Sequence, residues 1–221
     1  MNKSRNAIAL AMTGASGAAY GLRLLECLLQ AGEQIYLMVS APGQVVIAME
    51  TDLKLPGRPD DMQETLSAHY HARGINLKPG QLRVFGKDQW TAPVASGSNA
   101  PRAMVVCPCT SGTLSAIAHG ASNNLLERAA DVMIKEHRKL ILVPREMPLS
   151  VIHLDNMARL ARAGAVILPP SPGFYTHPQS VADLVDFVVA RVLDQLRVPH
   201  ALTPRWGEAR DAGPAPGTET A

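Results

Sequence analysis

Short hydrophobic runs alternate along the chain with segments in which hydrophobic residues recur every three or four positions. The runs predict buried β-strands, and the recurring positions predict amphipathic helices. Strands are expected at Ala7–Met12, Gln34–Ser40, Gln81–Phe85, Ala103–Cys107, Lys139–Pro144 and Ala165–Leu168. Helices are expected at Tyr20–Gln30, Val45–Glu50, Met62–His71, Thr113–Ala118, Asn124–Glu136 and Leu149–Ala163. This alternation is typical of an α/β fold in which helices wrap a parallel sheet.

A further long helix is expected after Ser180. Ser180, with Asp183 three residues further on, approximates a capping box. The hydrophobic stripe of this helix is formed by Val181, Val185, Val188 and Val192.

The length and composition favour one domain. The chain has 221 residues, 47% hydrophobic and 18% charged, which is typical of a soluble globular protein. We expect one domain over residues 1–208 and a disordered tail over residues 209–221, which are rich in Ala, Gly and Pro. The basic N-terminus and its apolar run could suggest a signal peptide, but a Gly-rich turn follows, so a first strand–helix unit is expected. No run approaches the roughly 18–20 apolar residues that a membrane span needs.

Charge and cysteine content exclude several classes of protein. A net charge of +2 without a cluster of Lys and Arg gives no nucleic-acid footprint. The three cysteines form no disulfide framework, and Cys107-Pro-Cys109 lacks the spacing of a zinc or redox motif, so a cytoplasmic location is expected. The stretch PDDMQE (59–64) resembles an aspartate-rich magnesium motif, but it occurs once and is interpreted as an acidic helix start. No metal site is expected.

The stretch LAMTGASGAAYG (10–21) combines a strand, a Gly-rich turn and a helix start. Backbone N–H groups in such a turn favour a phosphate or another anion. The glycines do not follow the G-x-G-x-x-G pattern, so a mononucleotide is favoured over a dinucleotide, and Ser16 could donate to its ring or phosphate. The alternative is a tight turn without a ligand.

The stretch VVCPCTSGT (105–113) is a second strand exit that carries hydroxyl groups. Thr110, Ser111 and Thr113 supply the hydroxyls, and Gly112 lets a ligand approach the backbone. Ser and Thr are also common as plain helix caps. Two such exits in one sheet, however, converge on one crevice.

Two charged stretches have alternative interpretations. Arg128 and Lys135 are seven residues apart on one predicted helix face, with Asp131 between them. They form either an exposed ion-pair ladder or a cationic stripe that faces a phosphate. Arg145 and Glu146 follow a buried strand and form either a solvated ion pair or part of a site at the carboxyl end of the sheet.

The C-terminal third adds two aromatic residues and a cation. The stretch PPSPGFYTHP (169–178) is a Pro-rich loop that holds Phe174 and Tyr175. Arg191 lies at the edge of the hydrophobic face of the last helix, where it either needs a partner or extends to solvent along its aliphatic stem.

Taken together, these stretches resemble the flavin prenyltransferases, the UbiX-like family of flavoproteins. The resemblance covers Ile8 to Trp206, nearly everything except the tail. The motifs that follow one another in the family's order are TGASG (13–17), CPCTSGTLS (107–115), NNLLERAADVMIKE (123–136), LVPRE (142–146), PPSPGFY (169–175) and PRWGE (204–208). Thr110-Ser111 stands where Ser-Thr is common in the family.

The resemblance implies a flavodoxin-like Rossmann fold, a doubly wound parallel sheet in three αβα layers, that binds FMN. The implied enzyme is a prenyltransferase that moves a dimethylallyl group from dimethylallyl monophosphate to N5 and C6 of reduced FMN without a metal. The product, prenylated FMN, serves UbiD-type decarboxylases, and the family's role lies in ubiquinone biosynthesis. The family also implies a homo-oligomer, a dodecamer, in which some residues reach the site from neighbouring subunits.

The family's functional residues carry over one by one. The resemblance implies that FMN contacts Gly14, Ala15, Ser16, Ser40, Thr110, Ser111, Gly112, Thr113 and Arg145. The residues implied for the dimethylallyl phosphate are Arg128, Lys135, Glu146, Tyr175 and Arg191. The implied catalytic residues are Ser16, Glu50, Lys135, Glu146, Tyr175 and Trp206, with Glu50 near the flavin and Trp206 as an aromatic wall.

Two other functions are considered. An FMN-dependent decarboxylase of peptidyl-cysteine or phosphopantothenoylcysteine would need a catalytic His and an Asn-rich motif, which the corresponding stretch SGSNAPRAM (96–104) lacks. A flavin-binding module without turnover would keep both hydroxyl-rich turns but has no need of Lys135, Tyr175 and Arg191 together.

Overall fold

The computed structural model describes residues 6–205. The expected tail and Trp206 therefore lie outside the described residues. The described chain contains a single parallel sheet with strand order β3-β2-β1-β4-β5-β6. Its strands are β1 (Ile8–Met12), β2 (Ile35–Val39), β3 (Leu82–Val84), β4 (Ala103–Cys109), β5 (Lys139–Pro144) and β6 (Val166–Ile167).

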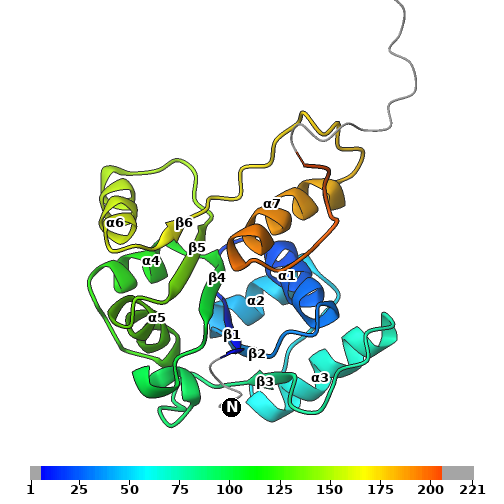
Figure 1. Cartoon of the computed structure of the whole chain (residues 1–221), viewed down its shortest axis with the longest axis horizontal. Helices are drawn as coiled ribbons and strands as arrows, with labels where there is room; N and C mark the ends of the chain where they lie inside the picture. Colours follow the sequence, from blue (N-terminus) through cyan, green and yellow to red (C-terminus); the bar gives the residue numbers. More distant parts are fainter. Residues whose placement is uncertain (1–5, 206–221) are drawn as a thin grey trace, which may run out of the picture.

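Helices connect the strands and cover both faces of the sheet (Figure 1). The α-helices are α1 (Ala18–Gln30), α2 (Ala41–Glu50), α3 (Pro59–Ala72), α4 (Ser111–Ala118), α5 (Leu125–Lys135), α6 (Val151–Arg162) and α7 (Val181–Leu196). Two 3-10 turns, η2 (Pro93–Ala95) and η3 (Gly97–Asn99), precede β4. Every strand and helix expected from the sequence is present, and the expected acidic start of α3 is confirmed by Asp60 and Asp61 in its first turn.

Two hydrophobic cores lie on opposite faces of the sheet. One contains residues of α1, α3 and α7, such as Leu24, Leu66 and Val189. The other contains residues of α4, α5 and α6, such as Ile117 and Leu160. The result is the expected three-layer α/β fold with a doubly wound sheet.

The last helix differs from the prediction in one position. Its capping box is confirmed, because Ser180 and Asp183 accept hydrogen bonds from each other's backbone N–H groups. Val185, Val188 and Val192 are buried as expected, but Val181 is 76% exposed. Val181 is the first residue of α7 and lies at the end of the helix, before the point where α7 packs against α1.

Within residues 6–205, no helix is both long and apolar enough to cross a bilayer. The same residues bring together no group of three or more His, Cys, Asp or Glu side chains that could hold a metal ion.

Candidate functional site

The carboxyl ends of four neighbouring strands form the candidate site. The sheet changes winding direction between β1 and β4, and ligands in open α/β sheets bind at such a point. Backbone hydrogen bonds continue past the strand ends: Ser40 N–H donates to the Met12 carbonyl at 3.0 Å, and Arg145 N–H donates to the Cys109 carbonyl at 3.2 Å. The exits of β1, β2, β4 and β5 are therefore held side by side.

The Gly-rich turn after β1 already holds an anion, which is the carboxylate of Glu50. The N–H groups of Gly17 and Ala18 donate to this carboxylate at 2.9 and 2.8 Å, and the Ser16 hydroxyl also hydrogen-bonds to it. Gly17 occupies the N-cap of α1 in a left-handed conformation, with φ of 112°, and provides no side-chain cap. The anion that this turn binds therefore belongs to the chain itself.

The environment of Glu50 lowers its pKa from the ordinary value of 4.5. Desolvation alone would raise this pKa, but hydrogen bonds from Ser16, Gly17 and Ala18, together with the charge of Arg145, outweigh it. Because the pKa is lower in the folded state, Glu50 contributes stability that is fully present above its unfolded pKa. That contribution is lost as the pH falls through the folded pKa.

Glu50→Gln should therefore flatten the loss of stability in acid. We expect the free energy of unfolding of the variant to decline less than that of the wild type between roughly pH 5 and pH 3. Urea unfolding across this range measures the effect, and Glu64→Gln on the exposed side of α3 is the control. Identical slopes for Glu50→Gln and the wild type would show that the turn does not stabilise this carboxylate.

The turn after β4 offers free backbone donors at the start of α4. Thr110 caps this helix, because its hydroxyl oxygen accepts from the Thr113 N–H at 3.0 Å. No described contact uses the N–H groups of Ser111 or Gly112, the first two residues of the helix. A Cβ built on Gly112 would meet only the Thr110 hydroxyl, at 4.0 Å, so space lies in front of the backbone. Free N–H groups at a helix start favour a phosphate.

A cavity of about 240 Å³ lies beside this helix start. Ser40 and Thr113 line it together, and Ser40 caps α2 by accepting from the Gly43 N–H at 3.1 Å. The N-termini of α2 and α4 therefore flank one cavity. Met38, Phe85 and Leu126 supply its apolar lining, which suits a flat, partly apolar ligand that ends in a phosphate.

Lys87 and Asn124 also line this cavity and were not predicted as site residues. Asn124 caps α5 by accepting from the Glu127 N–H at 3.0 Å. An Asn at the start of a hydrophobic helix is a recognisable cap, so its place at a helix end could have been predicted, but its place in the cavity could not. Lys87 lies in an irregular segment, where no local pattern marks it as a site residue.

Arg145 and Glu146 do not pair with each other in the part of the chain that the structure describes. The Ser111 hydroxyl donates to Glu146 Oε2 at 3.1 Å, and the described ion pairs include none between Arg145 and Glu146. The Nε of Arg145 is buried without a hydrogen-bond partner. A buried guanidinium N–H without a partner is costly. Because the described residues contain no ion pair between Arg145 and Glu146, the solvated-pair alternative is wrong.

The two predicted cations of α5, Arg128 and Lys135, have separate partners. Arg128 pairs with Asp131 at 2.8 Å and donates to the Ala95 carbonyl, as the ladder alternative predicted. Lys135, however, pairs with Glu136 at the last turn of α5, and its Nζ lies beside Gly97 in the turn before β4. That is the amino end of the sheet.

The distance between Lys135 and Glu146 follows from β5. Lys135 comes four residues before the start of β5, and Glu146 comes two residues after its end. β5 has six residues, and a strand rises about 3.3 Å per residue, so the two ends are roughly 20 Å apart. One copy of the chain does not bring Lys135 and Glu146 together.

Arg191 and Tyr175 lie on the β6 side of the molecule, and neither lines the cavity between α2 and α4. Arg191 lies on α7 and pairs with Asp194 at 2.7 Å, with most of its side chain exposed. Tyr175 is 52% exposed and packs edge-on against Phe187, with ring centres 5.7 Å apart. Both residues are therefore accessible to a neighbouring molecule.

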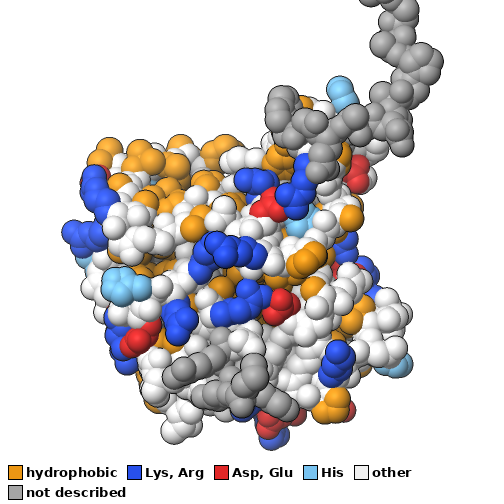
Figure 2. Space-filling view, in the orientation of Figure 1, with side chains coloured by type: hydrophobic (Ala, Val, Ile, Leu, Met, Phe, Trp, Pro, Cys, Tyr) orange, Lys and Arg blue, Asp and Glu red, His pale blue; other side chains and the backbone are white. Residues whose placement is uncertain are grey.

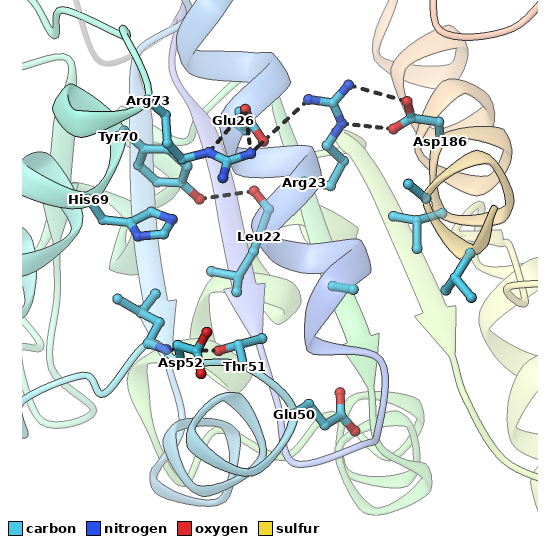
Figure 3. Close-up of a pocket in the computed structure, with 15 residues that line it drawn as sticks. Leu22, Arg23, Glu26, Glu50, Thr51, Asp52, His69, Tyr70, Arg73 and Asp186 are labelled. Carbon is cyan, nitrogen blue, oxygen red and sulfur yellow. Dashed lines mark hydrogen bonds and ion pairs between the residues drawn. The ribbon is translucent and has the colours of Figure 1, made fainter.

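A second cavity, of about 620 Å³, is a groove between α1, α3 and α7 (Figure 3). Arg23 bridges Asp186 at 2.7 Å and Glu26 at 3.2 Å, and Arg73 also pairs with Glu26. These charges satisfy one another. Glu50 lies at one end of the groove, beside the start of α1, so the groove adjoins the candidate site. The guanidinium groups of Arg23 and Arg73 in this groove are paired with carboxylates.

The segment after Glu146 exposes several large hydrophobic side chains. Met147 is 86% exposed and Ile152 is 69% exposed, and the others are Leu149, Val151 and Leu154. We call this set the α6 face; hydrophobic side chains gather at the position of α6 in Figure 2. Asn156 on the same helix is buried, and its Nδ2 has no hydrogen-bond partner. Exposed apolar patches of this kind mark surfaces that contact other molecules.

Comparisons with known proteins place these features in context. A family model described as Flavoprotein matches residues 1–193. The chain is 59% identical to the flavin prenyltransferase UbiX of Pseudomonas aeruginosa over 201 residues, which is 91% of this chain and 94% of the relative. It is 46% identical to that of Halalkalibacterium halodurans over 200 residues, 90% of this chain and 93% of the relative.

Solved structures show the same similarity. AnUbiX (PadA1) in complex with FMN and dimethylallyl pyrophosphate matches with a TM-score of 0.80 and 38% identity, over 93% of this chain and all of that one. A dodecameric FMN-dependent UbiX-like decarboxylase from Escherichia coli O157:H7 matches with a TM-score of 0.78 and 38% identity, over 90% of this chain and 98% of that one. The cypemycin decarboxylase CypD, at 15% identity and a TM-score of 0.53, shares the fold alone.

Proposed function

The chain belongs to the flavin prenyltransferases, the UbiX-like family of flavoproteins, and from this premise we propose how its own residues bind the flavin and transfer the prenyl group. The observation that carries the activity is the 59% identity to a flavin prenyltransferase over nearly the whole of both chains. The reaction that we propose moves a dimethylallyl group from dimethylallyl monophosphate to N5 and C6 of reduced FMN. The C–O bond of the donor breaks with both of its electrons going to the departing phosphate, and N5 of the reduced flavin supplies the electron pair of the first new bond and loses its proton. For the second bond, the alkene of the transferred group takes up a proton, and C6 supplies the electron pair and then loses its own proton.

The described residues fit FMN. The free N–H groups of Ser111 and Gly112, beside Ser40 and Thr113, suit its phosphate. The buried Nε of Arg145 lacks an acceptor, which the flavin ring would supply. Because Glu50 occupies the N–H groups of Gly17 and Ala18, we assign the phosphate to the cavity between α2 and α4 rather than to the first turn.

Cations and aromatic side chains suit the donor. A departing phosphate gathers negative charge, and Arg128, Lys135 and Arg191 would stabilise that charge. An allylic cation needs aromatic faces and exclusion of water, which Tyr175 and Trp206 would supply. Glu146, held by the Ser111 hydroxyl, would pass a proton to the phosphate or hold an arginine in place.

We propose that each site is shared between copies of the chain in a homo-oligomer. Lys135 lies at the opposite end of β5 from Glu146, so a second copy has to supply one of the two if both serve one site. The α6 face begins at the residue after Glu146, which suits a contact between copies beside the site. A dodecamer is the size that we infer, because a 38% identical relative assembles as one.

Glu146→Gln should slow transfer more than it weakens flavin binding. The amide still accepts from the Ser111 hydroxyl but cannot carry a proton to the phosphate, so we expect a transfer rate about 100-fold lower. Single-turnover transfer and FMN titration measure the two effects separately. Equal losses in rate and affinity would show that Glu146 has a structural role only.

Anaerobic incubation with reduced FMN and dimethylallyl monophosphate, without metal, tests the function. A mass spectrum that shows the flavin heavier by one C5 unit would establish prenyl transfer. FMN that binds but stays unchanged would favour dimethylallyl diphosphate as donor, and failure with both donors would favour a decarboxylase or a binding module. We further propose that a UbiD-type decarboxylase receives the product, in the cytoplasm and in the service of ubiquinone biosynthesis.

A further inference from the structure

We propose that Thr13 is a positioning residue that sets the distance between the two turns of the flavin site. Thr13 precedes the Gly-rich turn and belongs to none of the three groups of predicted site residues. Four polar or charged side chains are buried among residues 6–205, namely Thr13, Glu26, Gln81 and Asn156. Of these, Thr13 alone lies at a strand exit of the candidate site.

The Thr13 hydroxyl joins β1 to the end of β4. It donates to the Pro108 carbonyl at 2.8 Å and accepts from the Thr110 N–H at 2.9 Å. The Thr13 N–H also donates to the Pro108 carbonyl, at 3.2 Å. With 3% of its surface exposed, the hydroxyl makes these bonds away from water, where the loss of one partner leaves the other unsatisfied.

Thr13 affects the flavin site because it holds the backbone of Thr110. The hydroxyl of Thr110 caps α4, and the two N–H groups that follow are the free donors assigned to the flavin phosphate. Thr13 fixes the backbone of Thr110 and therefore the direction of those donors. It also fixes them relative to Ser16, which lies on the turn that Thr13 begins, and to the Glu50 carboxylate at the end of α2, which this turn binds. Among the hydrogen bonds of residues 6–205, Thr13 is the residue of the first turn whose side chain bonds to the backbone of the second.

This role deepens the proposed function and rests on its flavin-binding part, not on prenyl transfer. Thr13→Val keeps the shape of the side chain but removes both hydrogen bonds, whereas Thr13→Ser keeps the hydroxyl. We expect Thr13→Val to weaken FMN binding by about 10- to 100-fold, and Thr13→Ser to bind within about threefold of the wild type.

The matched control is Thr65→Val. Thr65 also donates its hydroxyl to a backbone carbonyl, that of Asp61 at 2.8 Å, but it lies on α3 away from the site. FMN dissociation constants and the melting temperatures of the flavin-free proteins are measured for all three variants. A Thr13→Val variant that melts earlier yet binds FMN with unchanged affinity would overturn the proposal, and so would failure of Thr13→Ser to restore affinity.

The proposal and the proposed reaction fail in different ways. A wild-type protein that binds FMN but transfers no prenyl group would refute the reaction and leave the role of Thr13 intact. If the wild type transfers the group and Thr13→Val binds FMN normally, the reaction stands and the role of Thr13 is refuted.

Discussion

Lys135→Ala should leave FMN bound and lower prenyl transfer by about 100- to 1,000-fold, the usual cost of removing one preorganised group that stabilises developing charge. Lys135 lies away from the cavity between α2 and α4, so flavin affinity should not change. Transfer is measured by the mass of the flavin after a single turnover, and FMN affinity by titration. Lys78→Ala, on an exposed loop, is the control. Undiminished transfer would remove Lys135 from the site.

The same variant tests whether the site is shared. Co-expression of Lys135→Ala and Glu146→Gln chains with different tags gives mixed oligomers, which can be purified through both tags. If Lys135 and Glu146 of one site come from different copies, some sites receive both intact residues, about a quarter of them for equal random mixing. Mixed oligomers should therefore transfer faster than either variant alone. If they do not, the two residues do not meet across an interface.

Arg145→Met should weaken FMN binding by about 10- to 100-fold. A hydrogen bond to a charged group contributes roughly 1.5–3 kcal/mol, and methionine keeps the aliphatic stem while it removes the buried Nε donor. The flavin-free protein should lose little stability, because the Nε has no protein acceptor to lose. FMN titration and thermal unfolding without flavin measure the two effects.

The charge of Arg145 gives a second measurement. Arg145 is one of the groups that lower the pKa of Glu50, so Arg145→Met should raise this pKa toward its ordinary value. Arg138→Met, at an exposed position after α5, should change neither the FMN affinity nor the pKa of Glu50. Unchanged FMN affinity in Arg145→Met would show that the guanidinium does not contact the flavin.

The fold could be predicted from the sequence because its signals are local. Hydrophobic runs such as Leu140–Val143 need two covered faces, and a parallel sheet under helices is the common solution. The turns after β1 and β4 could be predicted to converge because both follow strands of one parallel sheet. Thr110 and Ser40 were predicted as site residues and lie at the starts of two helices that flank one cavity.

The rest of the site depends on geometry that no local pattern contains. Helical spacing shows that Arg128 and Lys135 share a face, but it does not show that Lys135 lies at the amino end of the sheet. No local pattern could predict that the anion in the first turn is the carboxylate of Glu50. Glu50 is 33 residues from Gly17 in sequence and reaches it only because α2 ends beside α1.

The α6 face has a consequence for how activity depends on protein concentration. In the shared site that we propose, a single chain exposes Met147 and Ile152 and lacks the cation that a second copy would supply. Turnover per chain should therefore fall steeply on dilution, and a freshly synthesised chain should be inert until it meets others. Such a delay would confine the reactive allylic cation to assembled oligomers. The supply of prenylated FMN would then depend on the rate of oligomer assembly as well as on the amount of chain.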